Sequence, residues 1–148
     1  MLILNRRVGE SIHIGDDVCV TVYDKLRYHV TMGVIAPASA QLFYGETRLR
    51  PAILPDGERF YLISLLTAEG FRIDDVELLV NFTPSYLGTG SIRKRQVRVG
   101  VVAPPSVPVH REEIYLRRLE RDGKQCPPMP FATWLRHANL AVSSRAAA

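Results

Sequence analysis

The octapeptide VTMGVIAP at residues 30–37 returns as VRVGVVAP at residues 97–104, and this repetition decides how the rest of the chain is interpreted. A second pair of similar blocks lies upstream in the same order, ESIHIGDDVCVTV (residues 10–22) and EGFRIDDVELLV (residues 69–80), which match with a one-residue gap. Both halves also open on an extended apolar run, MLIL at the start and FYLISLL at residues 60–66. Ordered internal matches of this kind indicate a repeated unit, so the sequence predicts a tandem duplication.

Each half carries β-strand patterns. Residues 11–14 and 18–22 are rich in β-branched side chains, and the Gly-Asp-Asp between them is a hairpin signal. Both octapeptides end at Ala-Pro, and proline cannot donate a hydrogen bond to a strand ladder. Residues 83–94 (TPSYLGTGSIRK) are rich in turn formers, so we expect a protruding hairpin tip there. The predicted fold class is mainly β.

The pattern changes after Val109. HREEIYLRRL at residues 110–119 places its aliphatic side chains near one side of a helix, with glutamates early and arginines late, as the helix dipole favours. The proline-rich stretch CPPMP at residues 126–130 then interrupts the chain. Residues 131–142 predict a second short helix, and residues 143–148 a frayed tail.

Composition limits the classes of function. The chain has 148 residues, of which 47% are apolar and 23% charged, as expected of a folded globular protein. No apolar stretch approaches the roughly 18 residues that span a bilayer, and the N-terminus lacks the order of a signal peptide, so we expect a cytoplasmic protein with no membrane contact. The net charge of +4 permits a nucleic acid as partner without requiring one.

Enzyme and metal chemistry find little support in the sequence. Cys19 and Cys126 lie far apart without CxxC spacing, so neither a disulfide framework nor a zinc ribbon is expected. Cys19 alternates with valines and is interpreted as a small apolar residue. The four histidines do not fall at metal-ligand spacings, and no GxSxG, P-loop or dinucleotide fingerprint occurs. We therefore expect no enzyme, no metal and no cofactor.

The opening MLILNRRVGESIHIGDDVCVTV and the segment VRVGVVAPPSVPVHREEIY (residues 97–115) resemble the CsrA/RsmA family, the carbon storage regulators of bacteria. The resemblance implies an intertwined homodimer of five-stranded chains, each with a C-terminal helix, that binds GGA-containing loops of messenger and small RNAs. For this chain it implies a pseudo-dimer of two intertwined CsrA-like β units with a short C-terminal helix and tail. The expected units are residues 1–43, a linker at 44–59, residues 60–124 and a C-terminal extension at 125–148.

The departures from the family pattern are complementary. In the family, each RNA site pairs the first strand of one protomer with the last strand of the other. The first half here keeps Leu4, Arg6 and Arg7 of the opening strand, but it reads AQLFYG at residues 40–45 where HREEI would stand, which suggests that the closing strand is lost. The second half keeps VPVHREE but opens on LISLLT (residues 62–67) without arginine. One composite RNA site is therefore expected to survive, and its counterpart to be erased.

The resemblance also implies which residues form this site. Arginine guanidinium groups can pair with phosphates and read guanine edges, and an exposed strand can hydrogen-bond bases that are splayed from a loop. The expected RNA-binding residues are Leu4, Asn5, Arg6, Arg7, Arg98, Val109, His110 and Arg111. At the erased site, the apolar side chains of Leu65, Leu66 and Phe43 would replace charge and favour covering by the linker or tail.

Plainer interpretations stay open at each position. Arg6 and Arg7 could be surface arginines that protect an edge strand from aggregation. Arg98 could be merely solvated, and His110 could be structural. The two glutamates of HREEI are interpreted as a charge pair at a helix N-terminus rather than as catalytic carboxylates.

Two further hypotheses concern the whole chain. A degenerate duplicated copy could have lost RNA binding and act as a decoy or partner of a normal CsrA-type regulator. Alternatively, the chain could be a single domain with a large insertion, for which five sheet strands and one helical insertion would be the structural sign. The partners expected are a messenger or small RNA with a GGA motif, and a second CsrA-type chain or a copy of itself.

Overall fold

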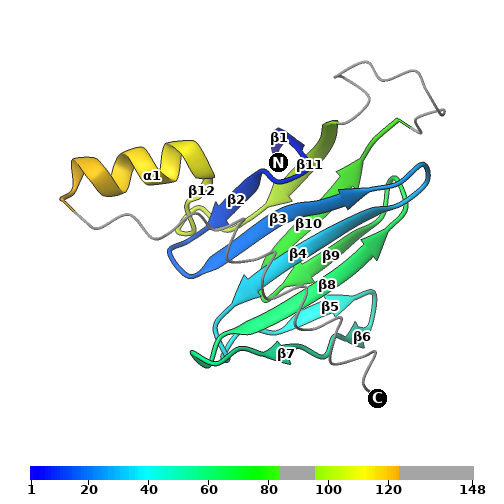
Figure 1. Ribbon diagram of the computed structural model, residues 1–148, viewed down its shortest axis with the longest axis horizontal. Helices are drawn as coiled ribbons and strands as arrows, with labels where there is room; N and C mark the ends of the chain where they lie inside the picture. Colours follow the sequence, from blue (N-terminus) through cyan, green and yellow to red (C-terminus); the bar gives the residue numbers. More distant parts are fainter. Residues whose placement is uncertain (84–95, 124–148) are drawn as a thin grey trace.

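The computed structural model describes residues 1–83 and 96–123, which form two six-stranded antiparallel sheets and one helix (Figure 1). In spatial order, sheet A contains β1 (Leu2–Arg7), β11 (Gln96–Val102), β10 (Val76–Asn81), β9 (Gly70–Ile73), β5 (Leu42–Tyr44) and β6 (Thr47–Arg48). Sheet B contains β12 (Val109–Arg111), β2 (Ser11–Ile14), β3 (Val18–Lys25), β4 (Val30–Ala36), β8 (Arg59–Leu65) and β7 (Ala52–Ile53). The helix α1 (Glu112–Arg121) follows β12 directly.

The two halves of the chain exchange their outer strands. Strands β9, β10 and β11 of sheet A come from the second half, and β1 and β5 of the first half flank them. Sheet B shows the reverse, with β2, β3 and β4 flanked by β12 and β8. The registers also correspond, because Ile3 of β1 lies opposite Gly100 and Leu62 of β8 lies opposite Gly33, the same position of each octapeptide. The predicted mainly-β, intertwined architecture is therefore confirmed.

The turn after the first strand of each half has the same backbone hydrogen bonds. Gly9 donates its N–H to the carbonyl of Val22, and Ala68 donates its N–H to the carbonyl of Val80. Both residues have positive φ, 92° for Gly9 and 67° for Ala68. Glycine adopts this left-handed conformation freely, whereas the Cβ of alanine makes it unfavourable. The second half thus keeps the turn of the first half in spite of an unsuitable residue.

Substitution of this alanine tests the turn. Ala68→Gly is expected to raise the free energy of unfolding by about 1 kcal/mol, because it removes a Cβ from a left-handed residue. The control is Ala52→Gly in β7, which should instead lower it by about 0.5–1 kcal/mol through added chain entropy. Urea denaturation measures both. Equal losses from the two substitutions would contradict the left-handed turn at Ala68.

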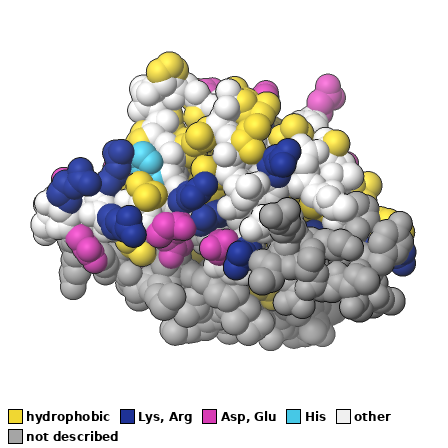
Figure 2. All heavy atoms as spheres, turned by 90° about the horizontal axis from the view of Figure 1, so that it is seen from above, with side chains coloured by type: hydrophobic (Ala, Val, Ile, Leu, Met, Phe, Trp, Pro, Cys, Tyr) yellow, Lys and Arg dark blue, Asp and Glu magenta, His cyan; other side chains and the backbone are white. Residues whose placement is uncertain are grey.

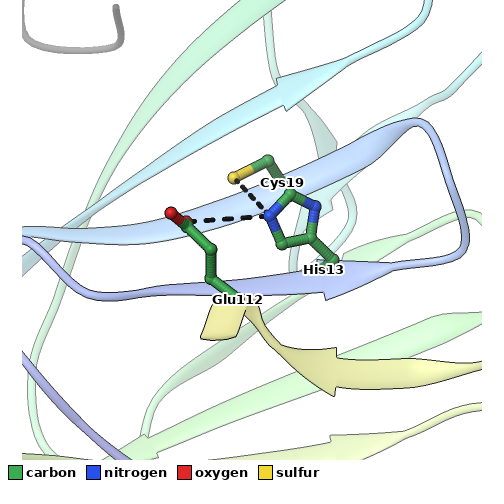
Figure 3. A group of neighbouring side chains, drawn as sticks. All are labelled: His13, Cys19 and Glu112. Carbon is green, nitrogen blue, oxygen red and sulfur yellow. Dashed lines mark hydrogen bonds and ion pairs between the residues drawn. The ribbon is translucent and has the colours of Figure 1, made fainter. Parts of the chain in front are cut away.

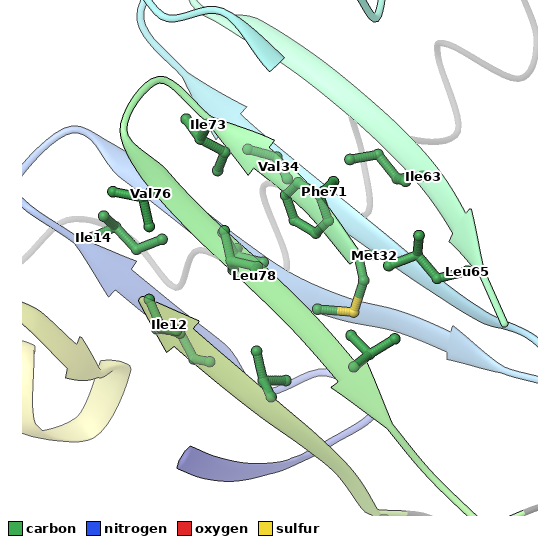
Figure 4. Packing of buried hydrophobic residues seen from close by; sticks show 14 of the residues in the cluster. Ile12, Ile14, Met32, Val34, Ile63, Leu65, Phe71, Ile73, Val76 and Leu78 are labelled. Atoms are coloured by element: carbon green, nitrogen blue, oxygen red, sulfur yellow. The ribbon is translucent and has the colours of Figure 1, made fainter. Parts of the chain in front are cut away.

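One hydrophobic core lies between the two sheets and is shared by both halves. Inward side chains of sheet A, such as Phe71 and Leu78, pack on those of sheet B, such as Ile12, Met32 and Ile63 (Figure 4). Met32 is fully buried, and Leu78 is 1% exposed. Because the cluster draws on strands of both halves, neither half has a separate core, and the halves are expected to fold together.

One expectation from the sequence is wrong. The first half has not lost its closing strand, since β5 pairs with β9 as β12 pairs with β2; what is missing is the HREEI sequence and the helix that follows it. Backbone pairing explains this difference, because strand hydrogen bonds do not depend on those side chains. The single-domain alternative has five sheet strands and one helical insertion as its structural sign, whereas residues 38–83 between the octapeptides form strands in both sheets.

The helix begins later than its sequence pattern predicts. His110 and Arg111 still belong to β12, where they lie opposite His13 and Ile12 of β2, and α1 starts at Glu112. The predicted hairpin tip beyond Thr83, the second helix at residues 131–142 and the tail lie outside the described residues. Within the described part of the chain, no helix is long and apolar enough to cross a membrane.

Candidate nucleic-acid interface

The opening strand of the first half and the closing strand of the second half meet at one side of the molecule. Strand β1 is the edge of sheet A, and a short turn carries it into β2, which is the strand that β12 pairs with at the edge of sheet B. The two edges are joined by side chains. Arg6 Nη1 and Nη2 donate hydrogen bonds to Glu113 Oε1 and Oε2 at 2.8 and 3.0 Å. The two segments with the family's characteristic residues therefore come together.

Arg6 is an internal tie between these segments. Its side chain is only 6% exposed, whereas that of Glu113 is 49% exposed. Nε donates to the carbonyl of Asn5 at 2.9 Å, and Nη1 also lies 3.4 Å from the carbonyl of Ser11. The hydrogen bonds from Arg6 hold the pKa of Glu113 below its usual value. From the sequence we expect Arg6 to offer its guanidinium to RNA. In the structure, both terminal nitrogens of this guanidinium instead donate hydrogen bonds to Glu113.

The outer face of sheet A carries polar and basic side chains at the end of β1. Alternation along β1 buries Leu4 and Arg6 and exposes Asn5 and Arg7. Arg98 of β11 lies opposite Asn5 and is exposed on the same face. Asn5, Arg7 and Arg98 line one surface hollow together with Thr67, Asn81, Phe82, Thr83 and Gln96. Within residues 1–83 and 96–123, neither Arg7 nor Arg98 has an ion pair.

The remaining predicted residues lie on or near β12. Arg111 is exposed at the end of the strand, opposite Ile12, and therefore on the face of sheet B that is turned toward sheet A. Val109 is half-buried and packs against the core, as Leu4 does in β1. His110 lies opposite His13 on the other face, where burial and the nearby Arg118 lower its pKa. The structure thus places His110 on the other face of β12 from Val109 and Arg111.

Basic and acidic side chains are interleaved at the end of the molecule that carries α1 (Figure 2). The first turn of α1 is acidic through Glu112 and Glu113, and its last turn is basic through Arg118 and Arg121, as the helix dipole favours. This confirms the charge pair expected at the helix N-terminus.

The pseudo-symmetric position on the opposite side is apolar. The shared register places Leu65 of β8 where Arg6 stands in β1, and Leu66 where Arg7 stands. Leu65 is fully buried, and Leu66 is 45% exposed. A leucine thus fills the space that the arginine fills on the other side.

Aromatic side chains occupy the rest of this opposite side. Because Leu42 lies opposite Ile73 as Val109 lies opposite Ile14, Tyr44 is the counterpart of Arg111. The Tyr44 hydroxyl donates a hydrogen bond to a carboxylate oxygen of Glu69. The neighbouring Phe43 ring lies 4.7 Å below the guanidinium of Arg72. The polar groups of Tyr44 and Arg72 are therefore engaged in contacts with other side chains of the protein.

Three potential metal ligands also converge, and sequence analysis missed them. His13 of β2, Cys19 of β3 and Glu112 of α1 place one donor atom each within 4.8 Å of one another (Figure 3). His13 lies opposite Cys19 in the β2–β3 hairpin. The hairpin signal between them could have indicated this pairing, since residues six apart around a short turn face each other across the strands. Cys19 is buried, but its Sγ contacts polar atoms of His13 and Thr21.

Comparison with known proteins shows that the chain matches one protein family. A model of CsrA, described as a global regulator protein family, matches residues 1–47 and 89–120, more than half of the chain. The translational regulator CsrA of Desulforamulus reducens is 46% identical over 46 residues, which are 31% of this chain and 58% of that protein. The translational regulator CsrA of Syntrophomonas wolfei is 44% identical over 48 residues, which are 32% of this chain and 63% of that protein.

The extent of these matches is also informative. The chain spans about three-fifths of the length of the curated relatives that it matches. No solved structure matches it significantly. The two segments that match the family model contain β1 and the β12–α1 segment, which are joined by Arg6 and Glu113. By this match the chain belongs to the CsrA family of global regulators.

Proposed function

We propose that the chain is a post-transcriptional regulator that binds GGA-containing loops of messenger or small RNA through one composite site. The site comprises Asn5, Arg7 and Arg98 on the outer face of sheet A, and Arg111 at the junction of β12 and α1. The observation that carries the proposal is the meeting of β1 with the β12–α1 segment, joined by the Arg6–Glu113 ion pair. The names of the relatives, translational regulators, give the biological role its support.

Each part of the proposed site has a physical role. Arg7 and Arg98 have no ion pair among the described residues, so their positive charge is available to phosphates. Asn5 can hydrogen-bond a base edge, and β1 is an edge strand with backbone groups that can do the same. Arg111 can present a planar guanidinium to a guanine. Arg6 acts as a positioning residue, because it fixes the start of α1 and with it the adjacent Arg111.

The proposal includes a tandem duplication in which only one of two sites is kept. Leucines replace Arg6 and Arg7 on the opposite side, and Tyr44 replaces Arg111. Without guanidinium groups in these positions, that side lacks the donors that would pair with phosphate and guanine.

A gel-shift titration tests the proposed function. A hairpin with a GGA loop should bind the purified full-length chain more tightly than a hairpin with the same composition and a scrambled loop. Equal retardation of both would indicate binding through charge alone. Absence of binding to either would contradict the proposal and favour the alternative that the chain is a decoy or protein partner of a normal CsrA-type regulator.

Stoichiometry gives a second prediction. Because only one side has arginines at the positions of Arg6, Arg7 and Arg111, isothermal titration should give one hairpin for each chain. An RNA with two GGA loops should accordingly show no gain in affinity from bridging within one chain, since a second intramolecular contact would need a second site. Two equivalent hairpins for each monomeric chain would contradict the one-site proposal.

A further inference from the structure

Three side chains from three different elements converge on the outer face of sheet B. His13 Nε2 lies 4.0 Å from Cys19 Sγ and 3.7 Å from Glu112 Oε2. Figure 3 shows the three side chains pointing toward one another, with the sulfur and the carboxylate both facing the same imidazole nitrogen. None of these residues belongs to the RNA site proposed above, so the cluster calls for a separate explanation.

The surrounding structure holds the cluster in place. Cross-strand pairing fixes His13 beside Cys19, and the first turn of α1 brings Glu112 to them. The ring of Tyr115 stacks on the imidazole at a centroid distance of 4.2 Å and an interplanar angle of 10°. His13 is 6% exposed and Cys19 is 9% exposed. Side chains this buried and packed need little ordering to bind a ligand.

We propose that His13, Cys19 and Glu112 bind one Zn²⁺ ion, with a fourth position open to water. An imidazole nitrogen, a thiolate sulfur and a carboxylate oxygen are the three ligand types that zinc takes in proteins. Magnesium and calcium prefer oxygen ligands alone, so the thiolate disfavours them. Zinc–ligand bonds of about 2.0–2.3 Å in a tetrahedral site place the donor atoms about 3.3–3.5 Å apart. The two separations from His13 Nε2, 3.7 and 4.0 Å, exceed these values by about 0.5 Å or less, and all three donor atoms lie within 4.8 Å of one another.

Cobalt is the probe for this site, because Co²⁺ takes the same ligands and gives visible absorption in a tetrahedral site with a thiolate. The full-length protein, freed of metal and kept reduced, is titrated with Co²⁺ and then with Zn²⁺. The expected result is one equivalent of bound Co²⁺ with a sulfur-to-cobalt charge-transfer band, which Zn²⁺ abolishes. Cys19→Ser should lose the band, and His13→Gln and Glu112→Gln should weaken Co²⁺ binding by about ten- to hundredfold or more.

The second cysteine supplies a matched control. Cys126→Ser should leave both the band and the stoichiometry unchanged, because the proposed thiolate ligand is Cys19. Circular dichroism identifies any variant that fails to fold, and Glu112→Gln, at the start of α1, tests the same site without a change in the core. A folded wild-type protein that shows no band, or a band that Cys126→Ser removes and Cys19→Ser keeps, would overturn the proposal. Neither result depends on RNA binding, so the zinc site and the proposed function can fail separately.

Discussion

Replacing Arg111 with alanine is expected to weaken binding of a GGA-loop hairpin by about ten- to hundredfold. Arg111 is exposed at the end of β12, beside the ion pair that joins the two sheets. The substitution removes a planar donor and one positive charge, and a good base contact is worth about 1–3 kcal/mol. If Arg111 reads a base, the difference in affinity between GGA and scrambled hairpins should also narrow. Fluorescence anisotropy titrations with both hairpins measure these two effects.

The internal symmetry of the fold supplies the control for this experiment. Tyr44 occupies the position on β5 that Arg111 occupies on β12. Tyr44→Ala should leave RNA affinity nearly unchanged, because leucines stand on that side in place of Arg6 and Arg7. An equal loss of affinity from both substitutions would mean that the RNA site does not lie on the side proposed here.

Loss of the Glu113 carboxylate is expected to destabilise the protein, whereas loss of its arginine partner is not. Glu113→Ala leaves the guanidinium of Arg6 buried without an anion, which should lower the free energy of unfolding by about 2 kcal/mol. The cost stays below that of a fully buried pair because Glu113 is half-exposed. Arg6→Leu should be nearly neutral, because the counterpart Leu65 is fully buried in the same structural position. Thermal and urea unfolding measure both variants.

A double-mutant cycle separates the ion pair from the helix dipole. In the Arg6→Leu background, Glu113→Ala should cost only about 0.5 kcal/mol, the contribution of an acidic residue in the first turn of a helix. If Glu113→Ala costs the same in both backgrounds, the two side chains do not interact, and the tie between β1 and α1 is wrong. RNA titration of the Arg6→Leu variant also shows whether a stable protein without this ion pair still positions Arg111 for binding.

The strand-rich core of the fold could be predicted because the pattern repeats. The octapeptides correspond to β4 and β11, and both blocks upstream of them form the predicted strands. The β5 strand was missed although Phe43 and Tyr44 favour strands, because its loss was inferred from the missing HREEI sequence and not from strand propensity. The late start of α1 was also missed, because HREEI fits a helix by periodicity while its first two residues pair with β2.

The candidate site was predictable in part. Alternation along a strand puts Leu4 and Arg6 on the same face, so burial of Arg6 follows from the pattern once Leu4 is assigned to the core. The partner of Arg6 was not accessible, since Glu113 lies 107 residues away along the chain. The cluster around His13 depended on tertiary structure for the same reason, because Glu112 reaches it only through the β12–β2 pairing.

The central claim is that one RNA site forms where β1 meets β12 and α1, and it can be tested by mapping backbone amide chemical shifts. The ¹⁵N-labelled chain is titrated with one equivalent of a GGA-loop hairpin. We expect shift changes at β1, at the facing end of β11 and at the β12–α1 junction, with little change at β5 and the end of β8. Changes centred on Tyr44 and Leu66, or equal changes on both sides, would contradict it.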